Sequence, residues 1–293
     1  MIGQAVIAEL RRRGEHVVAL SRDPERAARV LGADCEHHAW PSPQHAPPPE
    51  AALAGSDAVI HLLGEPIAQR WSAEVKREIR DSRVLSTRNL VEGLAALEPA
   101  RRPRALVSQS ATGYYGPRGD EELDEQAPPG GDFLAGVVVD WEREALAASE
   151  LRVVTTRTGV VLSARGGALA KMLPPFRLGL GGPVAGGRQY VPWIHLDDAV
   201  AALIRCALDD ALSGPVNVCA PTPVTNRELT RALARVLRRP AVLPVPAAAL
   251  HVLYGEMAQV VTTGQRAVPA ALRAAGHEFA HAVLEPALRD VLA

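Results

Sequence analysis

The residues whose chemistry stands out are the hydroxyls and phenols that end an apolar run at residues 105–116. This run is predicted to be a buried strand whose carboxyl end opens into a site. In open α/β sheets, ligands bind in the crevice beyond the carboxyl ends of the strands, so Ser110, Tyr114 and Tyr115 stand where chemistry takes place. Either phenol is a candidate proton donor. The alternative is that one tyrosine packs in the core and the other lies over a pocket without titrating.

Strands and helices alternate along the chain and predict the framework that positions these residues. Apolar strands are expected at residues 15–24, 58–64, 105–111, 153–162, 193–196 and 216–218. Helices are expected at residues 1–14, with Gly14 as the stop, at 26–31, 71–97 and 199–208, and over most of the chain from residue 226. This alternation predicts an α/β protein with a doubly wound parallel sheet and a smaller, mostly helical C-terminal lobe.

Composition narrows the class of partner. The chain has 293 residues and a formal net charge of −1, so nothing favours binding to nucleic acid or to an anionic membrane. Small-molecule partners are expected, and the oligomeric state stays open. Three widely spaced cysteines indicate a reducing compartment, and no long apolar run or leader-like start is visible, so a cytoplasmic location is expected.

Several motifs in order resemble one known superfamily. They are the segments at residues 110–116, 157–159, 193–198 and 214–217, together with Leu63-Gly64, the helix segment 79–83 and residues 167–176. The chain resembles the extended short-chain dehydrogenase/reductases, and more narrowly their atypical "epimerase family proteins", over essentially its whole length. The resemblance implies a Rossmann-type fold, a bound nicotinamide dinucleotide and a substrate lobe. It places Ser110 beside the nicotinamide, where its hydroxyl polarises a substrate carbonyl, and adds Leu63, Gly64, Arg83 and Ser108 to the cofactor site.

Two departures from the superfamily pattern matter. The glycine-rich loop that holds the pyrophosphate is represented only by residues 1–3, with Gly3 as its last glycine, so the first strand is apparently missing. We expect a misassigned start and poor dinucleotide binding by this polypeptide. The Tyr-x-x-x-Lys pair is also absent, because the residues four before Lys76 and Lys171 are Ser72 and Gly167. Any proton transfer therefore needs another donor, such as Tyr114 or Tyr115.

The end of the strand at residues 15–24 bears on cofactor choice. NAD sites place an acidic residue there, whereas a 2′-phosphate favours a hydroxyl and a guanidinium. Ser21 and Arg22 therefore favour NADP, while Asp23 keeps NAD possible. A solvated arginine at the start of a helix is the alternative.

Other polar residues have weaker functional readings. Arg177 and Arg188 lie in a glycine- and proline-rich passage that we expect to be an irregular substrate loop. They could clamp an anionic substrate there, or they could be solvent-exposed loop arginines without a ligand. His195 is a candidate base in the substrate site, although its segment is more typical of a strand-to-helix junction capped by an aspartate. Residues 120–125 are expected to be a solvated acidic loop. Cys35, His37 and His38 are expected to form a surface loop, and no metal site is predicted.

Four segments and two functions follow. Residues 1–165 are expected to form the dinucleotide-binding domain, 166–192 the substrate loop, 193–225 a return to the first domain, and 226–293 the C-terminal domain. The favoured function is that of an NADP-dependent oxidoreductase or epimerase-like enzyme acting on a carbonyl or hydroxyl compound. The alternative is a catalytically silent dinucleotide-binding protein that regulates a partner or senses redox state.

Overall fold

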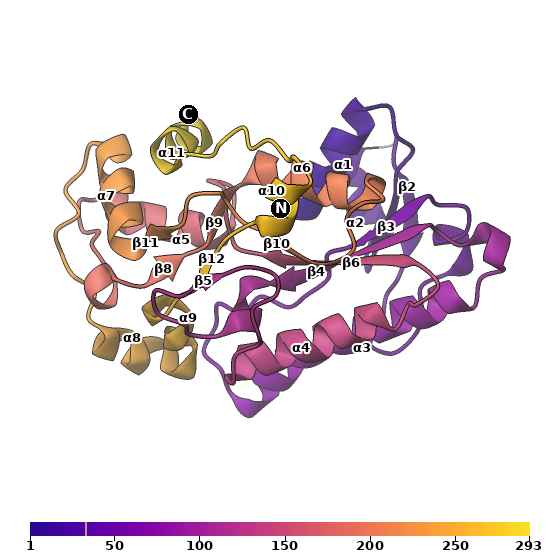
Figure 1. Cartoon of the computed structure of the whole chain (residues 1–293), viewed down its shortest axis with the longest axis horizontal. Helices are drawn as coiled ribbons and strands as arrows, with labels where there is room; N and C mark the ends of the chain where they lie inside the picture. Colours follow the sequence, from indigo (N-terminus) through magenta and orange to yellow (C-terminus); the bar gives the residue numbers. More distant parts are fainter. Residues whose placement is uncertain (33) are drawn as a thin grey trace.

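A parallel four-stranded sheet lies at the centre of the computed structural model, which describes residues 1–32 and 34–293. Its strands follow the order β10 (Gly214–Val218), β6 (Arg152–Thr158), β4 (Ala105–Ala111) and β3 (Ala58–His61). The register pairs Ser108 of β4 with His61 of β3 and with Thr155 of β6. The predicted parallel α/β sheet is confirmed (Figure 1). The polar ends of β4 and β6 therefore meet at one edge.

A second parallel pair lies apart from this sheet. Strand β1 (Val18–Ser21) pairs with β2 (Glu36–Ala39), and within the described residues no strand joins β1 to β3. The expectation of a surface loop at residues 35–38 is wrong, because Cys35 is buried and β2 begins at the next residue. Histidines at 37 and 38 do not resemble a strand by hydropathy, so only the pairing with β1 reveals it.

Helices cover both faces of the central sheet, as Figure 1 shows. Helices α1 (Ile2–Arg12) and α6 (Leu196–Leu208) cover one face, where Val6 and Leu203 join the same apolar core as Val107 of β4. Helices α3 (Ala73–Ala95) and α4 (Phe133–Leu146) cover the other. Helix α2 (Pro24–Leu31) packs against β1 and β2. Burial of helix stripes against a sheet is the main stabilising term of this architecture.

The passage at residues 166–192 differs from its expected form. Helix α5 (Gly167–Arg177) occupies its first part, and Leu169, Leu173 and Phe176 are buried on one face in a core that contains Trp193. The expectation of an irregular, non-core passage is therefore wrong for this segment. Pro174 and Pro175 lie inside the helix, where each lacks an N–H for the backbone ladder. The apolar residues at spacings of four and three form one buried face of the helix. Burial of that face outweighs the loss of the backbone hydrogen bonds.

Short strands and helices complete the molecule beyond the sheet, at the left of Figure 1. Strand β7 (Val160–Leu162) runs parallel to β9 (Trp193–His195), β8 (Tyr190–Val191) is antiparallel to β11 (Val224–Thr225), and β12 (Arg266–Ala267) runs parallel to β5 (Glu122–Leu123). The C-terminal helices are α7 (Asn226–Leu237), α8 (Ala247–Tyr254), α9 (Gln259–Thr262), α10 (Ala270–Ala274) and α11 (Leu284–Leu292). None of the helices formed by residues 1–32 and 34–293 has the length and apolar character needed to cross a bilayer.

Candidate functional site

The site begins where β4 ends. After Ala111 the chain turns through a short 3-10 helix (Thr112–Tyr115), and Gly116 closes the turn with a φ of 61°. Gly130 packs against this turn so closely that a Cβ on it would lie 2.7 Å from the carbonyl oxygen of Tyr115. Glycine is required at such an approach because any side chain would collide with the backbone. The rings of the two adjacent tyrosines in this turn meet edge to face, at 86° and with their centroids 5.4 Å apart.

A buried ion pair lies beneath the strand end. Arg157 at the end of β6 donates from Nε and Nη2 to the two carboxylate oxygens of Glu142 on α4, at 2.9 and 2.8 Å. Their side chains are only 4% and 8% exposed. Ser110 Oγ donates to the same carboxylate at 2.5 Å. Buried charges are tolerated only when paired and hydrogen-bonded, and this bidentate geometry meets that requirement.

Tyr115 extends the network into the C-terminal region. Its hydroxyl donates to Asn217 Oδ1 at 2.7 Å and accepts from Arg157 Nη1 at 3.2 Å. The Asn217 side-chain amide in turn donates to the carbonyls of Leu123 and Val268. Burial raises the pKa of Tyr115 to about 12, although Arg157 acts in the opposite direction. This phenol therefore keeps its proton near neutral pH and holds two parts of the fold together.

Glu125 gives the acidic run a structural role. The side chain is buried, and Oε1 accepts the backbone N–H groups of Asn217 at 2.9 Å and Ala271 at 3.1 Å. The expectation of a solvated acidic loop is wrong at this residue. The carboxylate is held because two backbone donors replace the water that it loses.

Tyr114 occupies a different position. Its side chain is half-buried, and the guanidinium carbon of Arg157 lies 3.4 Å from its ring centroid. A guanidinium stacked on an aromatic face is an attractive cation–π arrangement and fixes the plane of the ring. The two tyrosines thus divide between a core position and a partly exposed one.

Ser110 does not lie in an open hydroxyl cluster. It is 1% exposed, and its hydroxyl is bonded to Glu142. The placement of Ser110 beside a ligand stays a prediction, but its hydroxyl is held inside the fold. The reason is the strand alternation, which turns Ser108 and Ser110 toward the sheet face that α3 and α4 cover. Ser108 is likewise buried, with its Oγ 3.4 Å from the carbonyl of Gln109.

The residues proposed for a cofactor lie at the ends of β1 and β3. Ser21 ends β1, where its Oγ accepts the backbone N–H of Asp23, and Arg22 beside it is exposed. Leu63 and Gly64 follow β3. Gly3 lies in the first turn of α1, where an added Cβ would meet Leu62 at an ordinary 3.6 Å.

Arg83 covers the backbone at Gly64. Its guanidinium donates to the carbonyls of Ile79 and Glu65 at 2.9 Å each and lies 5.3 Å from the Trp141 ring. Burial lowers the pKa of Arg83 to about 10, so it remains charged at neutral pH. A Cβ at Gly64 would lie 3.1 Å from the guanidinium carbon. Gly64 is exposed beside the half-buried guanidinium of Arg83, and Arg22 provides an exposed guanidinium after β1. Guanidinium groups are suited to bind the phosphates of a dinucleotide.

The three residues predicted for substrate do not form one group with the network. Arg177 ends α5 and Arg188 follows the short turn Ala185–Gly187, and both are exposed. His195 is buried at the start of α6, where Nδ1 accepts the backbone N–H of Asp197 at 3.1 Å. The histidine, and not an aspartate, therefore caps this helix. Asp198 instead accepts the backbone N–H groups of Ala280 and His281.

Sequence reasoning missed Glu142, Glu125 and the central role of Arg157. A signal existed for two of them. Glu142 falls among the apolar positions Val138, Trp141 and Ala145 of one helix, and Arg157 interrupts a run of strand residues. A charge placed on an otherwise apolar face indicates a buried partner of opposite sign.

The comparisons with known proteins agree with this architecture. Residues 1–219 match the model of the NAD dependent epimerase/dehydratase family, and residues 245–291 match a domain of unknown function, DUF1731. The chain is 41% identical over 292 residues to an epimerase family protein of Mycobacterium bovis, covering 98% of this chain and 93% of that one. It is 37% identical over 299 residues to the chloroplastic SDR39U1 homolog of Arabidopsis thaliana, covering 99% and 84%.

A solved structure is also similar. The crystal structure of human epimerase family protein SDR39U1 with NADPH superposes with a TM-score of 0.87 at 32% identity, covering 99% of this chain and 95% of that one.

Proposed function

The chain belongs to the NAD dependent epimerase/dehydratase family, and from that premise we propose that it uses NADP(H) to act on a carbonyl or hydroxyl group of a small molecule. The similar human structure contains NADPH. In this chain, the exposed Arg22 beside Ser21 is the feature that favours a 2′-phosphate over a free ribose hydroxyl. Bound NADP(H) would supply or accept a hydride.

The observation that carries the enzymatic half of the proposal is the position of Tyr114. Tyr114 is the half-buried phenol that follows the carboxyl end of β4, and the Arg157 guanidinium stacks on its ring. Tyr114 gives or takes the proton, because the hydroxyl of Tyr115 is committed to Asn217 inside the core. Arg157, Glu142 and Ser110 keep the strand ends in place and do not contact the reacting atoms in this proposal.

Cofactor choice is tested by fluorescence titration of the protein with NADPH and with NADH. Arg22→Ala is expected to weaken NADPH binding by about tenfold or more, the value of one charge-assisted hydrogen bond, and to leave NADH unchanged. Arg29→Ala, an exposed arginine at the far end of α2, is the matched control. Preference of the unaltered protein for NADH would refute the NADP assignment. Because weak affinity is expected of this polypeptide, the titration extends to millimolar dinucleotide, and binding of neither dinucleotide at that concentration would refute the cofactor.

Turnover is tested with a panel of carbonyl and hydroxyl compounds, followed by NADPH absorbance. Once a substrate is found, Tyr114→Phe is expected to lower kcat by about 10²- to 10⁴-fold with dinucleotide affinity unchanged. Tyr115→Phe is expected to affect mainly stability, because it removes the hydroxyl that bonds Asn217. Equal kcat losses in the two variants would contradict the assignment of Tyr114.

A second candidate function is a dinucleotide-binding protein without turnover. The burial of Ser110 against Glu142 favours it, since a serine held in this way is not free to polarise a substrate carbonyl. Dinucleotide binding with no substrate-dependent absorbance change across the panel would support this candidate and refute the enzyme.

A further inference from the structure

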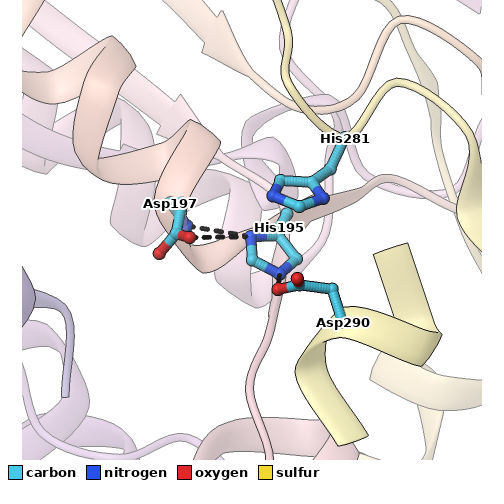
Figure 2. Close-up of side chains that lie close together, drawn as sticks. All are labelled: His195, Asp197, His281 and Asp290. Carbon is cyan, nitrogen blue, oxygen red and sulfur yellow. Dashed lines mark hydrogen bonds and ion pairs between the residues drawn. The ribbon is translucent and has the colours of Figure 1, made fainter. Parts of the chain in front are cut away.

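Four side chains of types that ligate metals gather where the start of α6 meets the C-terminal segment, and none of them belongs to the tyrosine network. They are His195 at the end of β9, Asp197 at the start of α6, His281 in the segment before α11, and Asp290 on α11 (Figure 2). One ligand atom from each can be chosen so that all lie within 4.8 Å of one another. The cluster is thus built from segments far apart in sequence.

The independent observation at this place is an unsatisfied nitrogen. His195 is 3% exposed, and its Nε2 makes no hydrogen bond with any residue the structure describes. This nitrogen lies 3.2 Å from Asp290 Oδ2, an ion-pair contact that lacks the geometry of a hydrogen bond. Figure 2 marks this contact with a dashed line. A buried nitrogen that faces a carboxylate without a well-formed hydrogen bond is incompletely satisfied, and a cation bound between the two would satisfy both.

The neighbouring histidine is held in place by its own backbone. The N–H groups of Ala280 and His281 donate to the buried Asp198 carboxylate at 2.8 and 3.0 Å. The His281 ring stacks on that of His195, with centroids 3.7 Å apart. Its backbone is anchored, but its ring is half-buried and can turn. Asp290 has a side chain that is 58% exposed and can move toward the same point.

We propose that His195 Nε2, His281 and Asp290 bind a divalent transition metal ion of the zinc class. Two imidazole nitrogens and one carboxylate oxygen are ligands that zinc commonly binds, and a water molecule would complete a tetrahedral coordination. Zinc bonds of this kind place donor atoms roughly 3.4 Å apart, so the side chains of His281 and Asp290 must move toward His195 on binding. The ion ties the C-terminal segment to the start of α6.

Asp197 has a different role from Asp290 because the two carboxylates face opposite nitrogens of His195. Asp197 Oδ2 lies 3.9 Å from Nδ1, which accepts the backbone N–H of the same residue. When Nε2 binds a metal, the ring proton moves to Nδ1 and needs an acceptor. The Asp197 carboxylate then accepts this N–H, an arrangement common behind metal-bound histidines. Metal binding therefore exchanges the helix-capping hydrogen bond from the Asp197 N–H to Nδ1 for a hydrogen bond from Nδ1–H to the Asp197 carboxylate.

The test is calorimetric titration of the full chain with Zn²⁺ alone in a buffer that does not chelate it. One equivalent is expected to bind and to raise the melting temperature. His281→Asn and Asp290→Asn each remove a proposed ligand whose side chain is at least partly exposed to solvent. Each is expected to weaken Zn²⁺ binding by at least roughly 10- to 100-fold, the loss that follows removal of a residue hydrogen-bonded to a metal ligand. His38→Asn is the matched control, because it removes a histidine that lies beside Glu36 on β2.

A second readout uses Co²⁺, whose visible absorption reports its coordination. The unaltered protein is expected to give an intense tetrahedral spectrum that His281→Asn removes. Absence of stoichiometric Zn²⁺ binding would overturn the proposal. So would binding that survives both His281→Asn and Asp290→Asn, or binding that His38→Asn abolishes, since the ion would then lie elsewhere.

Discussion

Glu142→Gln tests whether the buried ion pair holds the strand ends together. The substitution keeps the shape of the side chain but leaves the Arg157 guanidinium without its counter-charge in a setting where both side chains are under 10% exposed. Removing one partner of a buried pair costs about 3–5 kcal/mol, because the remaining charge is desolvated and unpaired. The total free energy of unfolding of a folded domain is about 5–15 kcal/mol, so this loss is a large fraction of the stability.

The chain provides a matched control on the same helix. Glu144, 13% exposed, pairs with Arg88, whose side chain is 47% exposed, so Glu144→Gln removes a pair that water screens from the arginine side. We expect that substitution to cost about 1 kcal/mol or less. Urea denaturation followed by circular dichroism measures both free energies of unfolding, with the slope against urea checked for constancy.

The comparison of the two variants decides the outcome. If Glu142→Gln lowers the free energy of unfolding no more than Glu144→Gln does, the buried pair does not stabilise the fold. The network of Arg157, Glu142 and Ser110 then does not keep the strand ends in place. The double substitution Glu142→Leu with Arg157→Met provides a further check, since it removes both charges. It is expected to recover part of the loss, because no unpaired charge remains.

Two other predictions concern pH and packing. Burial lowers the pKa of His61 to about 4 from its usual 6.5. The unfolded state therefore takes up a proton first, and stability falls as the pH drops from about 6.5 to about 4, by an amount on the order of 3 kcal/mol. Urea denaturation measures this loss, and His61→Gln should remove this pH dependence. A Cβ at Gly182 would lie 1.7 Å from the carbonyl oxygen of Leu243, so Gly182→Ala is expected to cost about 1–3 kcal/mol in thermal unfolding, whereas Gly136→Ala in α4, which meets nothing within 4 Å, should be neutral or stabilising by about 1 kcal/mol.

Local pattern was sufficient for most of the sheet. Strands β3 and β4 are apolar runs with clear ends, and α3 is capped by Ser72, whose side chain accepts the N–H of Val75. The single strand expected at residues 153–162 is divided into β6 and β7, which pair with different strands. Helix α5 was mistaken because glycine and proline dominate its surroundings, although Leu169, Leu173 and Phe176 have helical spacing. Strand β2 was missed because its four residues, Glu36–Ala39, carry no apolar alternation.

The candidate site divides in the same way. The sequence by itself determined that hydroxyls and phenols follow β4, because strand ends are a local property of hydropathy and turn residues. Only the tertiary structure decided what each of them touches. Ser110 meets Glu142 from 32 positions away, and Tyr115 meets Asn217 from 102 positions away. Such contacts depend on how helices and strands pack, and a buried hydroxyl takes whichever acceptor that packing brings within reach.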